Sequence, residues 1–413
     1  MNDPSCRSEY DNQALSVEQA RASILDTVQP ISGEQRLPLR QALGRILSGD
    51  VNARMDVPPQ KNSAMDGYAV RHEDLASATA LRVIGTSWAG KPYAQTVNVG
   101  EAVRIMTGAV MPDGADTVVI QEETQVDGET IRVQSTPRKG EFVRYPGDDV
   151  ARGAVVMHAG KRVGAAELGL LASQGYAEVS VRRRIRGAFF STGDELVGVG
   201  GALACGQIYD SNRYTLFGLL HEQGVDAIDL GVVGDDKAAL SAAFAQACDA
   251  ADIIITTGGV SVGDADFVKS VLREQGNVNF WKIAMRPGRP LTFGQIRDSC
   301  FFGLPGNPVS VAVTFSQFVV PALAKLSGAA VRTPLQLQVP TLSRLTKARG
   351  RRDFQRGVLL EHDGQLAVRS TGMQGSHVLS GMSDANCYIV LPEQCSEVNP
   401  GDIVAVQPFH ASY

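Results

Sequence analysis

The chain has 413 residues, and at about 100–200 residues per domain this length predicts two to four domains. Hydrophobic residues make up 44% of it and charged residues 20%, which is the composition of a folded globular protein and excludes wholesale disorder. The net charge of -5 provides no bulk attraction to nucleic acid or to an anionic membrane, so any anion site must be local.

The first residues are polar and show none of the charged-then-apolar pattern of a secretory signal. No apolar run approaches the ~20 residues that span a bilayer. The six cysteines are scattered and no two of them form a CxxC, so neither a disulfide framework nor a zinc cluster is supported. We therefore expect a soluble protein of a reducing compartment, the cytoplasm, that binds neither nucleic acid nor a membrane.

The N-terminal part of the chain alternates between helical and strand patterns. Ser16 and Gln19 form a capping-box pattern that predicts a helix over 16–28, a second short helix is expected over 40–47, and a third over 165–174 ends at Gly175. Between them lie short strand patterns, with Asp127-Gly128 as a hairpin turn: 81–84, 97–105, 117–121 and 130–134. We infer a β-rich domain over 51–146, inserted into a helical and extended linker domain formed by 8–50 and 147–180.

Residues 181–328 follow a regular strand–helix alternation that predicts a doubly wound, mostly parallel α/β sheet. The expected strands are 187–191, 228–233, 252–256 and 300–304, and the expected helices are 213–223, 237–250, 266–275 and 308–326. Residues 329–413 return to strands and predict a small barrel-like β domain with a hairpin turn at Asp363-Gly364. Its expected strands are 335–339, 354–361, 366–370, 387–391 and 403–407.

Four polar, glycine-containing clusters follow strands of the α/β region: 191–195, 206–212, 257–266 and 304–310. Ligands of open α/β sheets bind beyond the carboxyl ends of the strands, and glycine loops at helix N-termini suit phosphate. Each cluster alone reads as a tight turn, but four at one edge favour a single phosphate-binding crevice. Neither a P-loop nor a Rossmann fingerprint is present.

Acidic residues are concentrated in and beside these clusters: Asp194, Glu195, Asp210, Asp235, Asp236, Asp264 and Asp266. Carboxylates beside a phosphate site are best tolerated when a hard cation bridges them to the phosphate, and Mg²⁺ is the default. The alternative, that some of them cap helices or lie in solvated turns, is favoured for Asp235 or Asp236 taken alone.

Basic residues form two further groups. Lys282, Arg286 and Arg289 lie in a segment whose prolines exclude regular helix, so they are predicted to project from a loop, either as an oxyanion clamp or as a solvated surface. Arg351, Arg352 and Arg356 precede the polar run 371–377. In the β-rich insertion, a small-residue run surrounds Asp66 and is followed by the segment 104–108. The sequence shows no Ser-His-Asp or Cys-His pattern of the kind that nucleophilic catalysis uses.

Several of these segments together resemble one family. In chain order they are NSAMDGYAV, RIMTGA, STGDEL, GQIYDSN, TTGGVSVGDADF, FWKIAMRPGRP, LPGNPVS and DFQRGVL. Over about 14–410 the chain resembles the MoeA family of molybdopterin molybdenumtransferases, which is related to the E domain of gephyrin. TTGGVSVG and LPGNPVS are shared with other molybdopterin-binding domains, whereas NSAMDGYAV and the C-terminal β domain narrow the resemblance to this family.

The resemblance implies an L-shaped, four-domain subunit that forms a homodimer. It implies an enzyme that inserts molybdenum from molybdate into adenylylated molybdopterin, releases AMP with the help of Mg²⁺, and acts alongside other proteins of molybdenum-cofactor biosynthesis. The implied catalytic residues are Asp66, Thr107, Glu195, Asp235, Asp266 and Lys282, of which Glu195 and Asp266 hold Mg²⁺. The implied substrate-binding residues are Asp149, Gly258, Gly259, Ser261, Gly263, Arg286, Pro305, Gly306, Asn307, Pro308, Arg356 and Ser376.

Within that family pattern, Lys282 and Arg286 are assigned to the pterin phosphate or molybdate. Arg356 with Ser376 is assigned to molybdate, between the α/β domain and the C-terminal domain. Asp66 and Thr107 are expected to reach the crevice from the neighbouring subunit of the dimer. Arg286 and Arg289 depart from the family, which commonly carries lysine there, so the charge is kept but a planar fork replaces a point charge.

Two other functions remain open. A molybdopterin adenylyltransferase shares the α/β domain, but that family usually has a single domain, and the β domains and NSAMDGYAV argue against it. A non-catalytic scaffold like gephyrin would not need Asp66, Glu195 and Asp266, all of which are in place. The sequence does not specify the molybdate affinity, the discrimination against tungstate, the dimer interface or the acceptors of the product.

Overall fold

The structure is a computed structural model that describes residues 14–258, 272 and 276–409. The chain folds into two compact units, each with its own hydrophobic cores. One unit comprises the segment ending at Gln35, residues 44–48, and the chain from Val181 onward. The other comprises Arg36–Leu43 and Gly49–Ser180.

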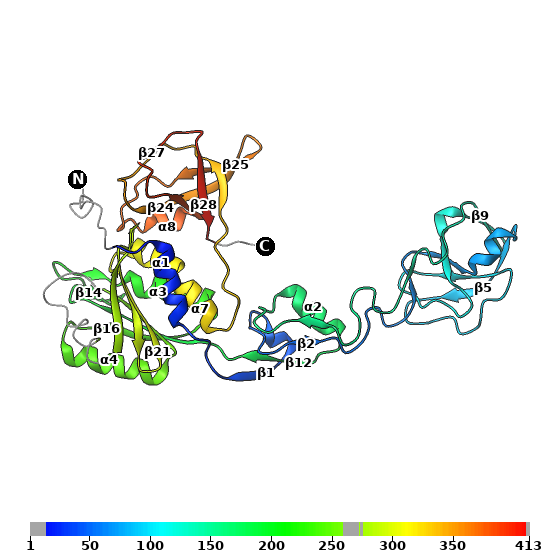
Figure 1. Ribbon diagram of the computed structural model, residues 1–413, viewed down its shortest axis with the longest axis horizontal. Coiled ribbons are helices and arrows are strands. Elements are labelled where there is room, and N and C mark those ends of the chain that lie inside the picture. Colours follow the sequence, from blue (N-terminus) through cyan, green and yellow to red (C-terminus); the bar gives the residue numbers. More distant parts are fainter. Residues whose placement is uncertain (1–13, 259–271, 273–275, 410–413) are drawn as a thin grey trace. The chain divides into compact units, whose positions relative to one another are not determined.

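The first unit is built on a six-stranded sheet (Figure 1). In spatial order its strands are β16 (Asp226–Val233), β13 (Arg186–Thr192), β17 (Ile253–Thr257), β21 (Ser299–Leu304), β20 (Pro290–Ile296) and β18 (Gly276–Lys282). The first four are parallel, and β20 is antiparallel to both of its neighbours, so only β20 runs against the other five. The predicted, mostly parallel sheet is confirmed, and β18 and β20 are strands that the sequence pattern did not reveal.

Helices cover both faces of this sheet because its central strands β13, β17 and β21 are buried on both faces. Odd-numbered residues such as Phe189 and Ile253 join a core with α1 (Val17–Thr27), α3 (Ser211–Glu222), α6 (Pro308–Thr314) and α7 (Val320–Leu326). Their even-numbered neighbours Phe190 and Ile254 join a second core with α4 (Lys237–Ala250). The doubly wound arrangement is therefore confirmed. The predicted helix over 266–275 lies outside the described residues apart from Leu272.

A π-helical turn, Phe315–Val319, joins α6 to α7 into one continuous helix, as the sequence predicts for 308–326. This helix of 19 residues is long and apolar enough to cross a membrane by length and composition, although no such run was expected. In this fold 78% of the apolar stretch is buried inside the protein, so its composition is explained by its position in the core of the α/β sheet.

Helix α1 forms as predicted and begins with a complete capping box. Ser16 Oγ accepts from Gln19 N at 3.1 Å, and Gln19 Oε1 accepts from Ser16 N at 2.9 Å. Val17, Ala20 and Ile24 are buried in the core of the α/β sheet. The helix therefore belongs to the first unit, whereas the predicted domain limits group residues 8–50 with 147–180.

The first unit also contains the C-terminal sheet. Its strand order is β19 (Met285–Arg286), β24 (Arg352–His362), β26 (Cys387–Leu391), β28 (Ile403–Pro408) and β22 (Leu337–Pro340). β25 (Gln365–Ser370) pairs with the later part of β24, on the same edge as β19 and opposite β26. A bridge between Thr341 and Val368 brings β25 against the chain that follows β22, which gives the sheet its barrel-like closure. Short elements complete it: β23 (Leu345–Thr346), α8 (Ser380–Asp384) and β27 (Glu397–Val398). The five predicted strands and the Asp363-Gly364 hairpin are confirmed.

The second unit contains another six-stranded sheet. Its order is β7 (Thr117–Ile120), β4 (Gly67–Val70), β6 (Glu101–Ile105), β5 (Leu81–Ser87), β9 (Thr130–Val133) and β8 (Thr124–Asp127). The Asp127-Gly128 hairpin is confirmed, but β4, which lies between β6 and β7, was not recognised. Gly67 begins β4 where a Cβ would overlap the carbonyl oxygen of Val119, so only glycine permits this pairing.

The rest of the second unit is α2 (Ala165–Ser173) with short strand pairs. The pairs are β2 (Val51–Asn52) with β11 (Val155–Met157), and β3 (Asn62–Ser63) with β10 (Val143–Arg144), while β1 (Glu34–Pro38) and β12 (Glu178–Arg182) form a separate ribbon. Gly175 follows α2 at φ +71°, the left-handed C-terminal stop that the sequence predicts. The predicted helix over 40–47 is wrong, because a short 3₁₀ turn, Leu39–Ala42, is followed by Gly44 at φ +77°.

Candidate active site

The carboxyl ends of three neighbouring strands meet at one edge of the α/β sheet. The parallel registers place Ser191 beside Thr257 and Thr257 beside Leu304. The hydroxyls of Ser191 and Thr257 are 2.9 Å apart and buried. The loops that follow these three strands therefore start side by side.

Gly258 allows these loops to pack main chain against main chain, with Gly306 next to it. Gly258 has φ +85°, and a Cβ on it would overlap the carbonyl oxygen of Thr192. A Cβ on Gly306 would lie 3.9 Å from the Cα of Gly258. The fourth cluster joins them, because Asn212 Nδ2 donates to the carbonyl of Gly306 at 2.6 Å. The described parts of all four predicted clusters thus lie together, and we call this edge the crevice.

The crevice contains several buried polar atoms that have no hydrogen-bond partner in the described part of the chain. They are Thr192 Oγ1, Asp210 Oδ2, Asn212 Oδ1 and Arg213 Nε. Arg213 lies 3.7 Å from Asp210 and 3.6 Å from Asp229, so its charge is compensated although its hydrogen bonding is not. Asp210 Oδ2 and Arg213 Nε are partners in that ion pair, which leaves Thr192 Oγ1 and Asn212 Oδ1. A buried polar atom without a partner costs about 1–3 kcal/mol, so these two are the atoms that a polar ligand or water would satisfy.

Two of the acidic residues at this edge have structural roles. Asp210 Oδ1 accepts from Arg213 N at 3.2 Å and caps α3, and Asp236 Oδ1 accepts from Ala238 N at 2.9 Å and caps α4. The capping alternative is therefore confirmed for Asp236. The loops after β13 and β16 meet where Asp194 Oδ1 accepts from Asp235 N at 3.4 Å. Gly259, Ser261, Gly263, Asp264 and Asp266 lie outside the described residues.

Among the residues that the structure describes, this edge offers one exposed carboxylate that could bind a cation. Residues 14–258 and 276–409 contain no group of three side chains placed to hold a metal. Mg²⁺ does not need one, because it keeps several waters and commonly takes one or two carboxylates together with substrate phosphates. Glu195 is exposed in the loop after β13 and provides one such carboxylate.

Two of the three basic residues lie in strands rather than in the predicted loop, whereas Arg289 does lie in a loop, between β19 and β20. Lys282 is the last residue of β18, and Arg286 lies in β19. Lys282 is exposed, and its carbonyl accepts from Leu15 N at 2.9 Å. The β20 partner of Lys282 is Pro290, so Pro290 begins a strand rather than interrupting a loop.

Because β19 pairs with β24, Arg286 belongs to a second cavity, a polar cleft of about 340 Å³ that we call the C-terminal cleft. It is lined by Arg286, Arg344, Leu345, Thr346, Asp353, Gln355, Ser370, Gly372, Gln374 and Gly375. The loop at its rim, 373–376, reaches the crevice side of the sheet, because the carbonyl of Ser376 accepts from Val309 N in the first turn of α6 at 3.1 Å. The fold thus brings Arg286, Ser376 and Pro308 into one region.

Arg356 is fully buried and shapes this loop. Its Nη2 donates to the carbonyls of Met373 at 2.7 Å and Gly375 at 3.2 Å, and its Nη1 donates to that of Gln374 at 3.3 Å. Gln374 Oε1 in turn accepts from Arg356 N at 2.7 Å. The predicted contact of Arg356 with molybdate stays a prediction, and the structure adds a second task, which is to hold the rim of the C-terminal cleft in place.

Asp66 and Thr107 are brought together at one edge of the second unit's sheet. The antiparallel register pairs Gly67 with Ile105, so the loops beside them start at the same edge. Thr107 donates from both its N–H and its hydroxyl to Asp66 Oδ1, each at 2.7 Å. These two hydrogen bonds lower the pKa of Asp66. Asp149, also in this unit, donates from its N–H to the carbonyl of Val57 at 2.9 Å.

Replacing Thr107 with valine should raise the pKa of Asp66 while leaving it below the ordinary value. The hydroxyl donor is lost, but the stronger main-chain donor remains. Because the folded-state pKa is lowered, the stabilisation that comes from ionised Asp66 is present above its unfolded value and is lost as pH falls through the folded one. Carbon-detected NMR titration of the Asp66 carboxyl measures the shift.

Thr130→Val is the matched control, since the Thr130 hydroxyl donates only to the carbonyl of Asp127 in the same sheet, at 2.9 Å. An Asp66 pKa that does not respond to Thr107→Val, or that responds equally to Thr130→Val, would contradict the hydrogen-bond assignment.

The sequence did not predict the structural roles of several side chains that build these cavities, although they lie in segments that it singled out. Asp353 and Gln355 in DFQRGVL, and Gln374 in the polar run 371–377, line the C-terminal cleft. Asn212, in the cluster 206–212, connects two loops of the crevice. The available signal was the pair Asp353 and Gln355 at the start of β24. They are two positions apart, and alternate residues of a strand lie on the same face. Arg344 carried no signal, because an isolated arginine in a polar turn is usually solvated.

Three family models together match nearly the whole chain. They are the MoeA N-terminal region (domain I and II) at residues 15–175, a probable molybdopterin binding domain at 188–325, and the MoeA C-terminal region (domain IV) at 338–409. The crevice lies in the second of these and the C-terminal cleft mainly in the third. The fold and the site thus define a protein with a molybdopterin-binding domain between two MoeA-type regions.

Whole-chain relatives show the family. The chain is 44% identical to the molybdopterin molybdenumtransferase of Haemophilus influenzae over 96% of this chain and 99% of that protein. It is 40% identical to the enzyme of the same name from Nostoc sp. over 89% and 87% of the two chains. The crystal structure of the molybdopterin biosynthesis moeA protein from Pyrococcus horikoshii matches with a TM-score of 0.83 at 28% identity, covering 96% of this chain and all of that one. The chain belongs to the molybdopterin molybdenumtransferase family.

Proposed function

We propose that this enzyme transfers molybdenum from molybdate to adenylylated molybdopterin, releasing AMP and forming the molybdenum cofactor. The observation that carries the proposal is the crevice itself. Gly258 and Gly306 expose main chain at the carboxyl edge of the sheet, beside the N-terminus of α6 and two buried polar atoms that have no hydrogen-bond partner among the described residues. Such an edge suits a phosphorylated ligand.

The crevice binds the adenylylated pterin, and the C-terminal cleft binds molybdate. In the crevice, Pro305, Gly306 and Asn307 lead into α6, whose N-terminus favours the pyrophosphate of the adenylylated pterin. In the cleft, the guanidinium groups of Arg286 and Arg344 supply positive charge for a tetrahedral dianion. The two lie on either side of the loop 373–376, which contacts α6 through Ser376, so the dianion is delivered next to the pterin site.

Cleavage of the phosphoanhydride leaves negative charge on the departing AMP. Mg²⁺ held by Glu195 and Asp266 would offset that charge. Lys282, at the end of β18, is an exposed cation on the same sheet and adds to this stabilisation. Asp235 belongs to the loop that meets Asp194, and it helps to set the position of the loop that carries Glu195.

We further propose a homodimer in the cytoplasm, in which Asp66 and Thr107 of one subunit, with Asp149, complete the crevice of the other. Their support is the hydrogen-bonded Asp66–Thr107 pair, which holds a carboxylate at an exposed sheet edge. Other proteins of molybdenum-cofactor biosynthesis are the proposed partners, because the substrate must arrive already adenylylated and the product must be passed on.

The decisive experiment incubates the purified chain with adenylylated molybdopterin and measures the release of AMP. Release should require both molybdate and Mg²⁺, and Glu195→Gln should slow it by about 100-fold, a typical loss when one group that stabilises transition-state charge is removed. Glu222→Gln is the control, because Glu222 is exposed at the other end of α3. Formation of adenylylated molybdopterin from molybdopterin and ATP would favour an adenylyltransferase instead, and no turnover of any kind would favour a scaffold.

A further inference from the structure

Asp353 is a buried carboxylic acid in the wall of the C-terminal cleft. It begins the DFQRGVL segment, but the proposed reaction gives it no role. It lies in β24, directly beside Arg286 in the parallel register with β19. Only 5% of it is exposed, and it lines the same cavity as Arg286 and Arg344. Gln355 Nε2 donates to Asp353 Oδ2 at 3.1 Å, which fixes the orientation of the carboxyl group.

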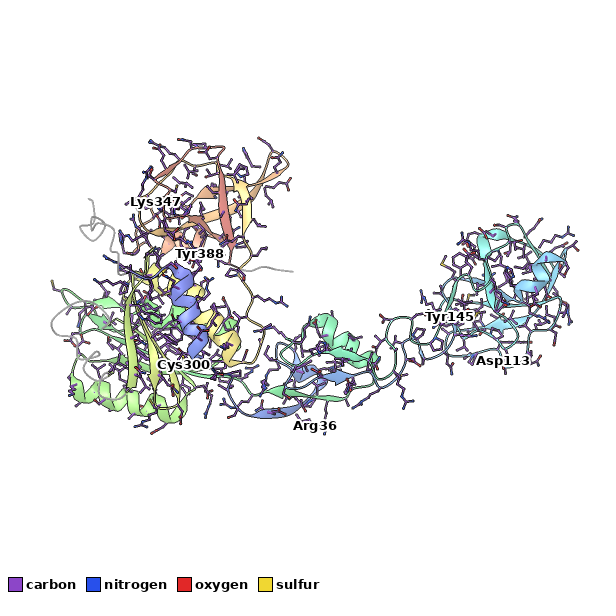
Figure 2. The ribbon with its side chains drawn as sticks, viewed as in Figure 1. Arg36, Asp113, Tyr145, Cys300, Lys347 and Tyr388 are labelled. Carbon is purple, nitrogen blue, oxygen red and sulfur yellow. The ribbon has the colours of Figure 1, made fainter. Side chains whose placement is uncertain are left out.

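Charged groups surround this carboxyl from every element that packs on it. Arg286 approaches from β19, Lys347 from the turn after β23, Arg351 from the chain before β24, and Arg356 from β24 itself. Figure 2 shows Lys347 in this C-terminal domain. Burial raises the pKa of Asp353 above its ordinary value, although the Gln355 hydrogen bond and these cations oppose the shift. Desolvation thus outweighs the positive surroundings.

The two protonation states of Asp353 act on an anion in opposite ways. An ionised carboxylate only accepts hydrogen bonds and cancels the charge of one neighbouring cation, so it repels a dianion. A neutral carboxyl donates a hydrogen bond from its O–H. A fully deprotonated tetrahedral dianion such as molybdate offers only acceptors, so it complements the neutral form and conflicts with the ionised one.

We propose that Asp353 couples oxyanion binding in the C-terminal cleft to the uptake of one proton by its own carboxyl group. The inference rests on the proposed function only in that a tetrahedral dianion occupies this cleft. The bound dianion stabilises the neutral carboxyl and so raises the proton affinity of Asp353 further. Binding is therefore tightest at low pH, and above the pKa of free Asp353 it weakens by about tenfold per pH unit until the pKa of the complex is reached.

Calorimetric titration of the full-length protein with molybdate, and separately with sulfate, tests this coupling. Titrations at one pH in two buffers of different ionisation enthalpy count the protons that are taken up, and a pH series gives the slope of affinity. Both anions should show uptake of close to one proton. Asp353→Asn keeps a hydrogen-bond donor and cannot titrate, so it should bind with little dependence on pH. Asp363→Asn, at the exposed hairpin turn of the same domain, should behave like the unmodified protein.

Anion binding without proton uptake by the unmodified protein would overturn the role of Asp353 and leave the proposed function standing, whether or not the Asp353→Asn protein folds. Absence of anion binding in the cleft would remove the inference together with the cleft's assignment to molybdate. Molybdate-dependent release of AMP, measured on the same preparation, then decides separately whether the proposed function survives.

Discussion

Arg356→Met should destabilise the first unit by about 3–5 kcal/mol and disorder the rim of the C-terminal cleft, the largest effect that we expect from a single side chain. The guanidinium is fully buried and donates to three consecutive carbonyls, those of Met373, Gln374 and Gly375. Methionine fills much of the volume but leaves these acceptors inside the protein without donors, at about 1–3 kcal/mol each where they stay buried. Binding of molybdate should fall with the loss of the rim.

Hydrogen–deuterium exchange locates the damage. Val309 N donates to Ser376 O across the rim and α6, so peptides that cover 308–314 and 371–376 should lose protection together in Arg356→Met. Arg369→Met is the matched control: it removes an exposed arginine from β25 of the same sheet, outside the lining of the cleft, and it should cost less than about 1 kcal/mol. Equal losses of stability and protection in the two variants would show that the carbonyl contacts of Arg356 do not hold the rim.

Gly258→Ala should disable the crevice. Gly258 has φ +85°, a conformation that costs an alanine roughly 1–2 kcal/mol, and the added methyl group would also overlap the carbonyl oxygen of Thr192. Relieving that overlap moves main chain rather than a flexible side chain, which adds about 1–3 kcal/mol. Because the loop of Gly306 packs on Gly258, the same movement separates the two loops and should weaken the binding of adenylylated molybdopterin.

Gly224→Ala separates the two contributions. Gly224 also has a positive φ, +71°, and a Cβ there meets nothing within 4 Å. It lies between the end of α3 and the start of β16, at the opposite edge of the sheet from the crevice. It should cost only the conformational part, with crevice binding kept. Thermal unfolding and equilibrium binding of adenylylated molybdopterin measure both variants. If Gly258→Ala and Gly224→Ala bind alike, close packing of the glycine loops is not what forms the site.

The central strands and their glycine loops could be predicted because their signals are local. Apolar runs such as Ile253–Thr257 are buried on both faces, and each is followed by a polar turn that contains glycine, so strand ends and loops are readable from the residues alone. The α1 capping box and the hairpins at Asp127-Gly128 and Asp363-Gly364 are local in the same sense. These signals placed the crevice at the correct edge of the sheet.

Elements that depend on distant partners were missed or misplaced. β18 contains Gly276, Asn277 and Asn279, which favour turns, and it is a strand because β20 pairs with it. Met285–Arg286 is too short to be recognised as a strand and becomes one through β24, more than 60 residues later in the chain. Helix α1 carries an apolar face that was predicted correctly, but nothing in that face specifies which core covers it.

For this protein, the sequence alone determined the mostly parallel sheet, the small β domains on either side of it, the glycine loops of the crevice and the family. Only the tertiary structure decided that Arg356 is buried and holds the rim of a cleft, and that Asp353 lies beside Arg286 in its wall. The physical reason is that the role of an ionisable side chain depends on how deeply it is buried and on its neighbours from distant segments of the chain. An arginine is a solvated charge in one environment and a structural hydrogen-bond donor in another, and burial raises the pKa of an aspartate that would be an ordinary acid in water.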